Sequence, residues 1–198
     1  NDWDVSKVTT MNGMFENAKK FNGNMTSWKV GKVTSMENMF FSAGMFENDK
    51  ISGWAISVGT NTYAMLIGTK FSNANLKTYI NKYCSNDSTT SKSVVDRYGH
   101  PDTWDVSAVT DMSDLFREIE NKSCDVDLEE WDVSRVTNMT NMFKGFTSFN
   151  GDISGWDVSS VTEMYSMFQG ASSFNKDLSD WDVSSVTDMR FMFYKASS

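Results

Sequence analysis

The sequence has no long apolar run, an excess of acidic over basic residues, and a single histidine. Its 198 residues include 18 Lys and Arg against 26 Asp and Glu, which gives a net charge of −8 at neutral pH. Because Lys and Arg supply most contacts to phosphates, this acidic balance argues against a nucleic-acid partner. No apolar run approaches the roughly 20 residues that a transmembrane helix needs, so we expect no transmembrane segment in this sequence.

The scarcity of histidine and cysteine argues against common catalytic and metal sites. The only histidine, His100, has no neighbouring nucleophile that would suggest a Ser-His-Asp or Cys-His site. The sequence also has neither a Gly-rich phosphate loop nor a Cys-x-x-Cys pair. We therefore expect that the protein is not an enzyme and has no catalytic residues, no metal site and no cofactor, with calcium alone left open below.

What the sequence does have is a tryptophan that recurs at a fixed interval. Successive Trp residues are 25, 26, 50, 27, 25 and 25 positions apart, and the gap of 50 spans two intervals; they are Trp3, Trp28, Trp54, Trp104, Trp131, Trp156 and Trp181. A fixed period in the twenties indicates a repeat architecture in which each unit stacks on the next. Because the pattern is under way at the first residue and unfinished at the last, we expect it to continue beyond this sequence.

Each repeat follows the pattern Trp-Asp-Val-Ser-x-Val-Thr-x-Met-x-x-Met-Phe-x-x-Ala-x-x-Phe-Asn-x-Asp-Ile/Leu-Ser, numbered here from Trp so that the first Met is +8. Its opening, as in residues 156–159, alternates apolar and polar residues, which indicates a strand. Apolar residues then follow at spacings of three and four, which indicates a helical face. The sequence therefore predicts an α/β solenoid of leucine-rich-repeat-like coils of about 25 residues, each with one short parallel strand and one short helix or 3-10 turn.

Methionine occupies much of the predicted core. Twelve of the 14 Met lie at +8 or +11: Met11, Met14, Met36, Met39, Met65, Met112, Met139, Met142, Met164, Met167, Met189 and Met192. Because these positions recur along the whole chain, we expect the unbranched Met side chains to fill the core rather than to bind copper or another cofactor.

The repeat pattern is interrupted between Trp54 and Trp104. A helical apolar stripe over residues 71–83, capped by Ser72 or Asn73, precedes a polar stretch, 85–93, which we expect to be a loop. An atypical element commonly covers the end of a repeat array. We therefore predict three parts: 1–66 as the C-terminal part of a first array, 67–103 as an interruption with a helical N-terminal cap, and 104–198 as a second array.

The two cysteines, Cys84 and Cys124, permit at most one internal disulfide. We favour this bond over two buried free thiols, because glycosylation sequons fit a secreted chain, in which disulfides persist. The bond would pin the helical cap to the first coil of the second array. The four sequons are Asn24, Asn86, Asn121 and Asn138.

The alternation that buries Trp and Val turns the residues at +1, +3 and +6 outward. In the second array this candidate binding face comprises Asp105, Ser107, Thr110, Asp132, Ser134, Thr137, Asp157, Ser159, Thr162, Asp182, Ser184 and Thr187. Stacked carboxylates repel each other unless hydroxyls, backbone N–H groups or a cation lie between them. Calcium is one interpretation, and a bond from each Asp to the backbone of its own corner is the other. A single Thr per repeat, mixed with Asp, argues against an ice-binding surface.

The motif Trp-Asp-Val-Ser-x-Val-Thr-x-Met-x-x-Met-Phe, followed by Ala-Ser-Ser-Phe-Asn-x-Asp-Leu/Ile-Ser-x-Trp, resembles the BspA-like leucine-rich-repeat surface proteins. This family includes the 25-residue repeats of Mycoplasma lipoproteins and is also common in algae and protists. The resemblance extends over about three quarters of the chain. It implies an extracellular or cell-surface location and a role in adhesion, and it implies no catalytic residues.

Together these features predict a non-enzymatic surface protein that binds other macromolecules, in adhesion or protein–protein interaction. The expected partner is a surface protein or glycan, or other copies of the same chain. Two alternatives remain open. One is a structural subunit of an extracellular filament or coat built from stacked arrays, and the other is a calcium- or glycan-dependent binding module.

Overall fold

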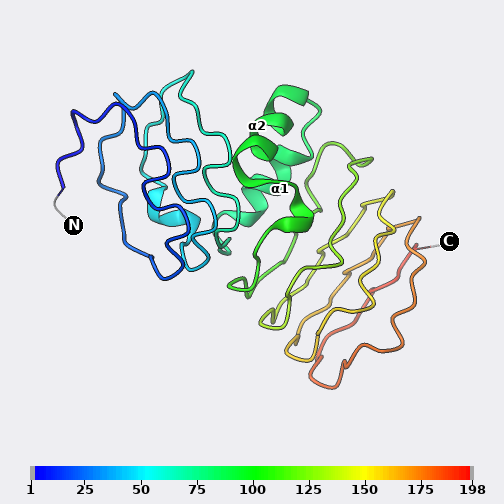
Figure 1. Cartoon of the computed structure of the whole chain (residues 1–198). Coiled ribbons are helices and arrows are strands. Elements are labelled where there is room, and N and C mark those ends of the chain that lie inside the picture. The colour runs from blue at the N-terminus through cyan, green and yellow to red at the C-terminus, as the bar shows by residue number, and fades with distance from the viewer. Residues whose placement is uncertain (1–2, 197–198) are drawn as a thin grey trace.

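The computed structural model describes residues 3–196, which run from the first repeat at one end of an elongated molecule to the last repeat at the other (Figure 1). Successive repeats lie side by side, and each is called a layer here and named by its Trp. The layers of Trp3, Trp28 and Trp54 form the first stack. The layers of Trp104, Trp131, Trp156 and Trp181 form the second stack, and two α-helices lie between the stacks.

The predicted α/β solenoid is wrong. Within residues 3–196 the helical elements are η1 (Asn48–Ile51), α1 (Leu76–Tyr83), α2 (Ser88–Tyr98) and η2 (Pro101–Thr103), and no β-sheet forms. Extended pairing between these residues is limited to isolated parallel bridges, such as Asn138 with Glu163 and Glu163 with Asp188. Residues 3–196 contain none of the coils, each with a strand and a helix, that define a leucine-rich-repeat solenoid, so the predictions of a leucine-rich repeat and of a solenoid are both wrong.

The segment at the start of each repeat, which was predicted to be a strand, forms a corner of two tight turns. In the Trp156 layer, the Val161 N–H donates to the Val158 carbonyl at 2.9 Å, which closes a four-residue turn. The Ser159 N–H donates to the Asp157 carboxylate at 3.1 Å, which forms an Asx-turn. The turn buries the Trp and both Val side chains and exposes Asp. The corner therefore produces the alternation that the sequence suggested for a strand.

The predicted helix is a series of consecutive four-residue turns. The Met167 N–H donates to the Met164 carbonyl at 3.2 Å, and the Gln169 N–H donates to the Ser166 carbonyl at 3.1 Å. Ser166 has φ of 54°, and Gly170 has φ of 71°, both in the left-handed region. A helix cannot continue through such residues. Spacings of three and four still place the Met and Phe side chains on one side, because each turn advances the chain by a similar number of residues.

Backbone hydrogen bonds between layers replace the missing helical bonds. N–H groups at +8, +10 and +12 donate to carbonyls at +7, +9 and +11 of the next layer. In the last pair these bonds join Met164 to Asp188, Ser166 to Arg190 and Phe168 to Met192, at 2.9, 3.0 and 2.9 Å. The same pairing occurs between the Trp3 and Trp28 layers. We call this set of bonds the interlayer ladder.

The core runs through the layers as columns of equivalent side chains. The ring centroids of Phe143, Phe168 and Phe193 are 5.4 Å apart in each successive pair. Most of the predicted Met positions are buried, which confirms their assignment to the core, but Met14 and Met189, in the two terminal layers, are exposed.

The helical segment replaces part of a layer at the junction of the stacks (Figure 1). The carbonyls of Asp96 and Arg97, at the end of α2, accept the Ala64 and Leu66 N–H groups at 2.6 and 2.9 Å, where the next layer would otherwise lie. Helix α1 begins at Leu76 with Asn75 at its N-cap, later than the predicted cap at Ser72 or Asn73. The predicted loop over 85–93 is wrong, because α2 begins at Ser88.

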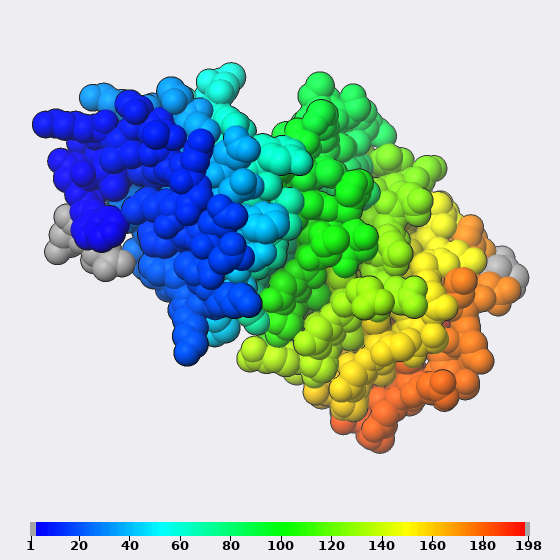
Figure 2. Space-filling model, viewed as in Figure 1, coloured from blue at the N-terminus to red at the C-terminus, as the bar shows by residue number. Residues whose placement is uncertain are grey.

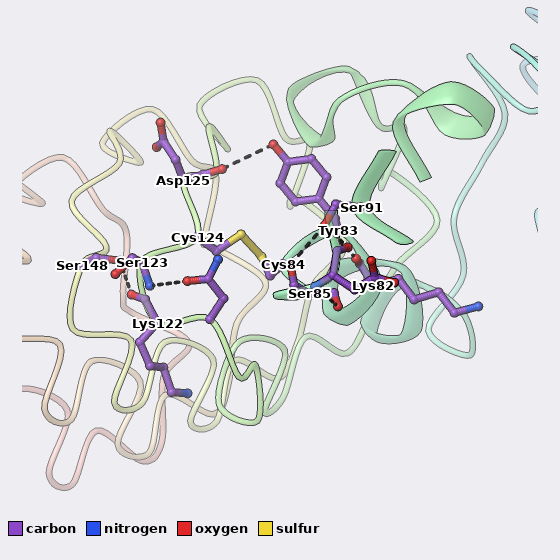
Figure 3. Close-up of a disulfide and its surroundings, with 12 residues drawn as sticks. Lys82, Tyr83, Cys84, Ser85, Ser91, Lys122, Ser123, Cys124, Asp125 and Ser148 are labelled. Atoms are coloured by element: carbon purple, nitrogen blue, oxygen red, sulfur yellow. Dashed lines mark hydrogen bonds between the residues drawn. A yellow bond between two sulfur atoms is a disulfide. The ribbon is translucent and has the colours of Figure 1, made fainter. Parts of the chain in front are cut away.

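The disulfide between Cys84 and Cys124 is present, as predicted (Figure 3). It joins the C-cap of α1 to the Trp104 layer, with Cα atoms 5.3 Å apart. The Tyr83 hydroxyl lies beside it and donates a 3.5 Å hydrogen bond to the Asp125 carbonyl. The helices are therefore fastened covalently to the second stack.

Candidate binding surface

The Asp residues at +1 are held by the serine of their own corner. Asp157 Oδ1 accepts the Ser159 hydroxyl at 2.6 Å and the Ser159 N–H at 3.1 Å. These two bonds lower the pKa of the Asp157 carboxyl, the hydroxyl having the larger effect. The Asp132 carboxylate accepts the same pair of bonds from Ser134. The Asp157 carboxylate therefore stays charged, and both carboxylates already have a partner within their own corner.

This geometry supports the backbone-capping interpretation of the Asp column rather than the calcium one. In Asp105, Asp132 and Asp157, one carboxylate oxygen accepts both the hydroxyl and the N–H of the neighbouring serine, and in Asp182 one oxygen accepts the Ser184 N–H. Within residues 3–196, no three Asp, Glu, His or Cys side chains lie close enough together to hold a metal ion. The arrangement provides a row of fixed negative charges and no cation cage.

The Thr residues at +6 are exposed or half-buried, and their donor groups are occupied between layers. The Thr162 N–H and hydroxyl both donate to the Thr137 carbonyl, at 2.8 and 3.1 Å. The Thr187 N–H and hydroxyl donate in the same way to the Thr162 carbonyl, at 2.8 and 3.1 Å. These hydroxyls therefore stabilise the stack and leave only their acceptor lone pairs for a partner.

The structure does not present all twelve predicted binding residues equally. Lys70 Nζ lies 2.8 Å from Ser107 Oγ and 3.8 Å from the Asp105 carboxylate, and Asn73 donates to the Thr110 hydroxyl at 2.9 Å. The set in the Trp104 layer is thus partly covered by residues that precede it. The contiguous open face consists of Asp132, Ser134, Thr137, Asp157, Ser159, Thr162, Asp182, Ser184 and Thr187.

A shallow acidic groove was missed by the sequence analysis. It lies between the Trp104 and Trp131 layers and is lined by Asp125, Asp127, Glu129 and Asp152, next to Cys124. The signal that could have found it is the uneven charge of the chain. Residues 1–103 contain 11 Lys and Arg and 9 Asp and Glu, for a net +2, whereas residues 104–198 contain 7 and 17, for a net −10. The two values sum to the −8 of the whole chain.

The four sequons differ in accessibility. Asn24 and Asn86 are exposed, and the Asn24 side chain accepts the Thr26 N–H. Asn121 and Asn138 are half-buried, and each accepts a backbone N–H, from Ser123 and Thr140 respectively. Asn138 also belongs to two interlayer bridges. The first pair is therefore better placed for modification.

None of the helices formed by residues 3–196 has the length and apolar character required to span a bilayer.

Comparison with known proteins returned one family model. It is described as "Mycoplasma protein of unknown function, DUF285" and matches twice, over residues 1–93 and 85–198. No curated protein and no solved structure gave a significant match.

Proposed function

Because this chain belongs to the family of Mycoplasma proteins of unknown function, DUF285, whose description leaves the function open, we propose a function from the chain's own surface. The protein is a non-enzymatic extracellular or cell-surface protein that binds other macromolecules. Its partner is a surface protein or a glycan.

The observation that carries this proposal is the open face of repeated corners in the second stack. Asp132, Asp157 and Asp182 are exposed at equivalent positions of three successive layers, each beside a serine. Such a row offers a partner the same weak polar contact several times at regular spacing. Contacts of this kind add up when the partner meets them together.

The acidic groove and the net charge of −10 over residues 104–198 favour a protein partner with cationic groups on its surface. Complementary charge speeds the encounter and selects against acidic partners. Because the predicted face is exposed, we expect binding of this kind to weaken as salt is added.

The proposed location rests on three features. A disulfide and exposed sequons at Asn24 and Asn86 suit an oxidising, secretory environment. A relation to the BspA-like surface proteins, supported by the repeated Trp-Asp-Val-Ser-x-Val-Thr motif, is part of the same proposal. This relation supports the proposed location and the proposed role in adhesion, and it says nothing about the fold.

Binding to the immobilised full chain tests the proposal. The probes are a Lys-rich peptide, an uncharged peptide, a neutral glycan and a sulfated glycan, each at low and high salt. The test variant, Asp132→Asn/Asp157→Asn/Asp182→Asn, removes three charges but keeps an acceptor for each serine, as Asn24 already does for Thr26 at 3.0 Å. The matched control, Glu16→Gln/Glu37→Gln/Asp102→Asn, removes three charges from the other half of the chain.

We expect the Lys-rich peptide to bind the wild type, and the test variant to bind it about tenfold more weakly, from about 0.5 kcal/mol for each lost pair. The control variant should bind it like the wild type. Equal weakening in both variants would mean that only total charge matters and would contradict the assigned face. Absence of binding to every probe, together with an intracellular location by antibody staining of intact cells, would overturn the proposed function.

A further inference from the structure

A cleft between two internal segments of the chain separates the start of helix α1 from the Trp104 layer. One wall is formed from residues 73–77 and the other from residues 111–115. In Figure 2 the helical segment, in green, lies against the second stack, which runs from yellow-green to orange. The cleft has a volume of about 250 Å³, less than the roughly 300–1,000 Å³ of pockets for whole small ligands, so it has room for a single side chain.

One wall of the cleft carries a row of backbone carbonyls without donors. Inside the second stack, carbonyls at +7, +9 and +11 accept N–H groups from the preceding layer, as the Asn138 carbonyl does from Met112 at 2.9 Å. The equivalent carbonyls of the Trp104 layer are those of Asp111, Ser113 and Leu115, and no backbone N–H among residues 3–196 donates to them. The preceding segment turns into a helix here, and the N–H groups of a helix bond along its own axis. The chain therefore leaves this carbonyl row unpaired.

The polar side chains beside the row have other partners. Asn73 Nδ2 donates to the Thr110 hydroxyl at 2.9 Å, and Asn73 Oδ1 accepts the Thr110 and Asp111 N–H groups at 2.9 and 3.2 Å. Lys77 Nζ lies 3.4 Å from the Glu118 carboxylate. Each of these donors therefore has a partner outside the carbonyl row.

The cleft combines hydrogen-bond acceptors with apolar lining. The exposed Asp111 carboxylate accepts the Ser113 N–H at 2.9 Å and places a negative charge at the cleft. Leu76, Met112 and Leu115 line the same cleft and are buried. A ligand that suits these surroundings has an apolar stem and a cationic head with several donors and no acceptor. Arginine meets these conditions, because its guanidinium group carries only donors and is weakly hydrated.

We propose that this cleft binds an arginine side chain of a partner protein. The guanidinium group donates to neighbouring carbonyls of the Asp111, Ser113 and Leu115 row, beside the Asp111 carboxylate, and the methylene stem lies on Leu76 and Met112. Lysine suits the cleft less well, because its ammonium group is a compact, strongly hydrated charge with fewer donors. The inference does not rest on the proposed function, which uses the open face of the later layers.

The test compares three peptides that differ at one central residue, which is arginine, citrulline or lysine in an otherwise uncharged sequence. Each is titrated into the full chain and followed by the backbone amide signals in NMR spectra, which detect affinities as weak as about 1 mM. Citrulline has nearly the shape of arginine without its charge, so we expect the arginine peptide to bind about tenfold more tightly than the citrulline peptide. The lysine peptide should also bind more weakly than the arginine peptide. The signals of residues 111–115 should shift most.

One variant removes the charge at the cleft and keeps its local structure. In Asp111→Asn the side chain still accepts the Ser113 N–H, as Asn138 does for Thr140 at 3.0 Å. We expect this variant to bind the arginine peptide about threefold more weakly, the effect of one exposed ion pair. The matched control, Glu163→Gln, removes one charge from the same position of another layer and should bind like the wild type.

A second variant, Ser113→Tyr, fills the cleft. Tyr165 occupies the equivalent position of the Trp156 layer, so the repeat accepts a ring there. We expect Ser113→Tyr to lose binding of the arginine peptide, while its amide signals outside the cleft stay close to those of the wild type. Unchanged binding in both Asp111→Asn and Ser113→Tyr would overturn the proposal, and so would equal affinity for the arginine and citrulline peptides.

The triple variant Asp132→Asn/Asp157→Asn/Asp182→Asn separates this cleft from the open face. We expect it to bind the arginine peptide like the wild type. If the triple variant loses the arginine peptide and Ser113→Tyr keeps it, arginine binds the open face, which overturns the cleft and supports the proposed function. Loss in Ser113→Tyr alone supports the cleft even if no partner for the open face is found.

Discussion

At the scale of single residues, the recurring indole links one layer to the layer before it. The Trp156 Nε1–H donates to the Leu128 carbonyl at 2.9 Å, and the Trp181 Nε1–H donates to the Ile153 carbonyl at 3.0 Å. In both pairs the acceptor is the residue three positions before the preceding Trp. Because the acceptor carbonyl lies in the turn that leads into the preceding Trp, the bond ties successive repeats together through a buried polar contact. Phenylalanine could fill the same space but could not make this bond.

The predicted consequence is a difference between Trp156→Phe and a variant that loses volume alone. Trp156→Phe leaves the buried Leu128 carbonyl without its donor, and we expect it to lower the free energy of unfolding by about 1–3 kcal/mol beyond the loss of volume. Phe143, a fully buried ring of the adjacent layer, has no polar side-chain atom, so Phe143→Leu should lose only the volume contribution. Urea unfolding followed by circular dichroism measures both. Equal losses would show that the indole bond adds nothing to ring packing.

At the scale of elements, helix α2 depends on its N-cap. The helix opens Ser-Thr-Thr-Ser, residues with little intrinsic helix preference. Asp87 Oδ1 accepts the Thr89 N–H at 3.0 Å, and Asp87 Oδ2 accepts the Thr90 hydroxyl at 2.6 Å. These bonds lower the pKa of Asp87 to about 2, and the bond from the Thr90 hydroxyl has the largest effect. A polar stretch that reads as a loop therefore becomes a helix because one carboxylate satisfies its first turn.

Acid should loosen α2 from this end. The pKa of Asp87 in the folded protein is about 2, below the ordinary value of 3.8 for an aspartate, so its stabilising effect is complete above about pH 4 and disappears as the pH falls through 2. Amide exchange of Ser91, whose N–H donates to the Asp87 carbonyl, should accelerate over that interval relative to the ordinary pH dependence of exchange. Asp87→Asn keeps a capping acceptor without the charge, so in this variant the additional acceleration should disappear. Its persistence in Asp87→Asn would assign the effect to another carboxylate.

At the scale of the whole molecule, the disulfide decides how the helical segment is attached. Helices α1 and α2 lie between two stacks, and Cys84 and Cys124 close a loop with a sequence separation of 40. Beyond the covalent bond, the Lys77–Glu118 ion pair at 3.4 Å and the Tyr83–Asp125 hydrogen bond connect the same two parts. Both of these contacts are exposed and individually weak. The covalent bond is therefore the strongest single restraint between the helices and the second stack.

We expect the double variant Cys84→Ala/Cys124→Ala to lose about 3–4 kcal/mol in the free energy of unfolding, because its unfolded chain is no longer restrained by a 40-residue loop. Urea unfolding of the variant and of the wild type with its disulfide reduced should give similar midpoints, both below that of the oxidised wild type. Equal midpoints for the oxidised and reduced wild type would contradict the assigned role.

The sequence alone was sufficient to identify the repeat length, the columns of core residues and the cysteine pair. The 25-residue interval of Trp, and the Met and Phe positions that follow it, report which side chains are buried together, and burial requires only that they share one side of the chain. The Cys pair required only a count of thiols and the expectation, drawn from the sequons, that the chain is secreted. These features do not depend on where the backbone hydrogen bonds go.

The tertiary structure alone decided the backbone. Spacings of three and four are compatible with a helix and with consecutive turns, and what separates the two is whether an N–H bonds four residues back or to another layer. For Met164 and Phe168 the acceptor lies 24 residues away, a distance at which local pattern carries no information. Glycines at +14, such as Gly145 and Gly170 with φ of 70° and 71°, were a partial signal that the chain turns there. Serine at +10, as in Ser166, has the same left-handed conformation. Composition alone therefore could not distinguish a helix from consecutive turns.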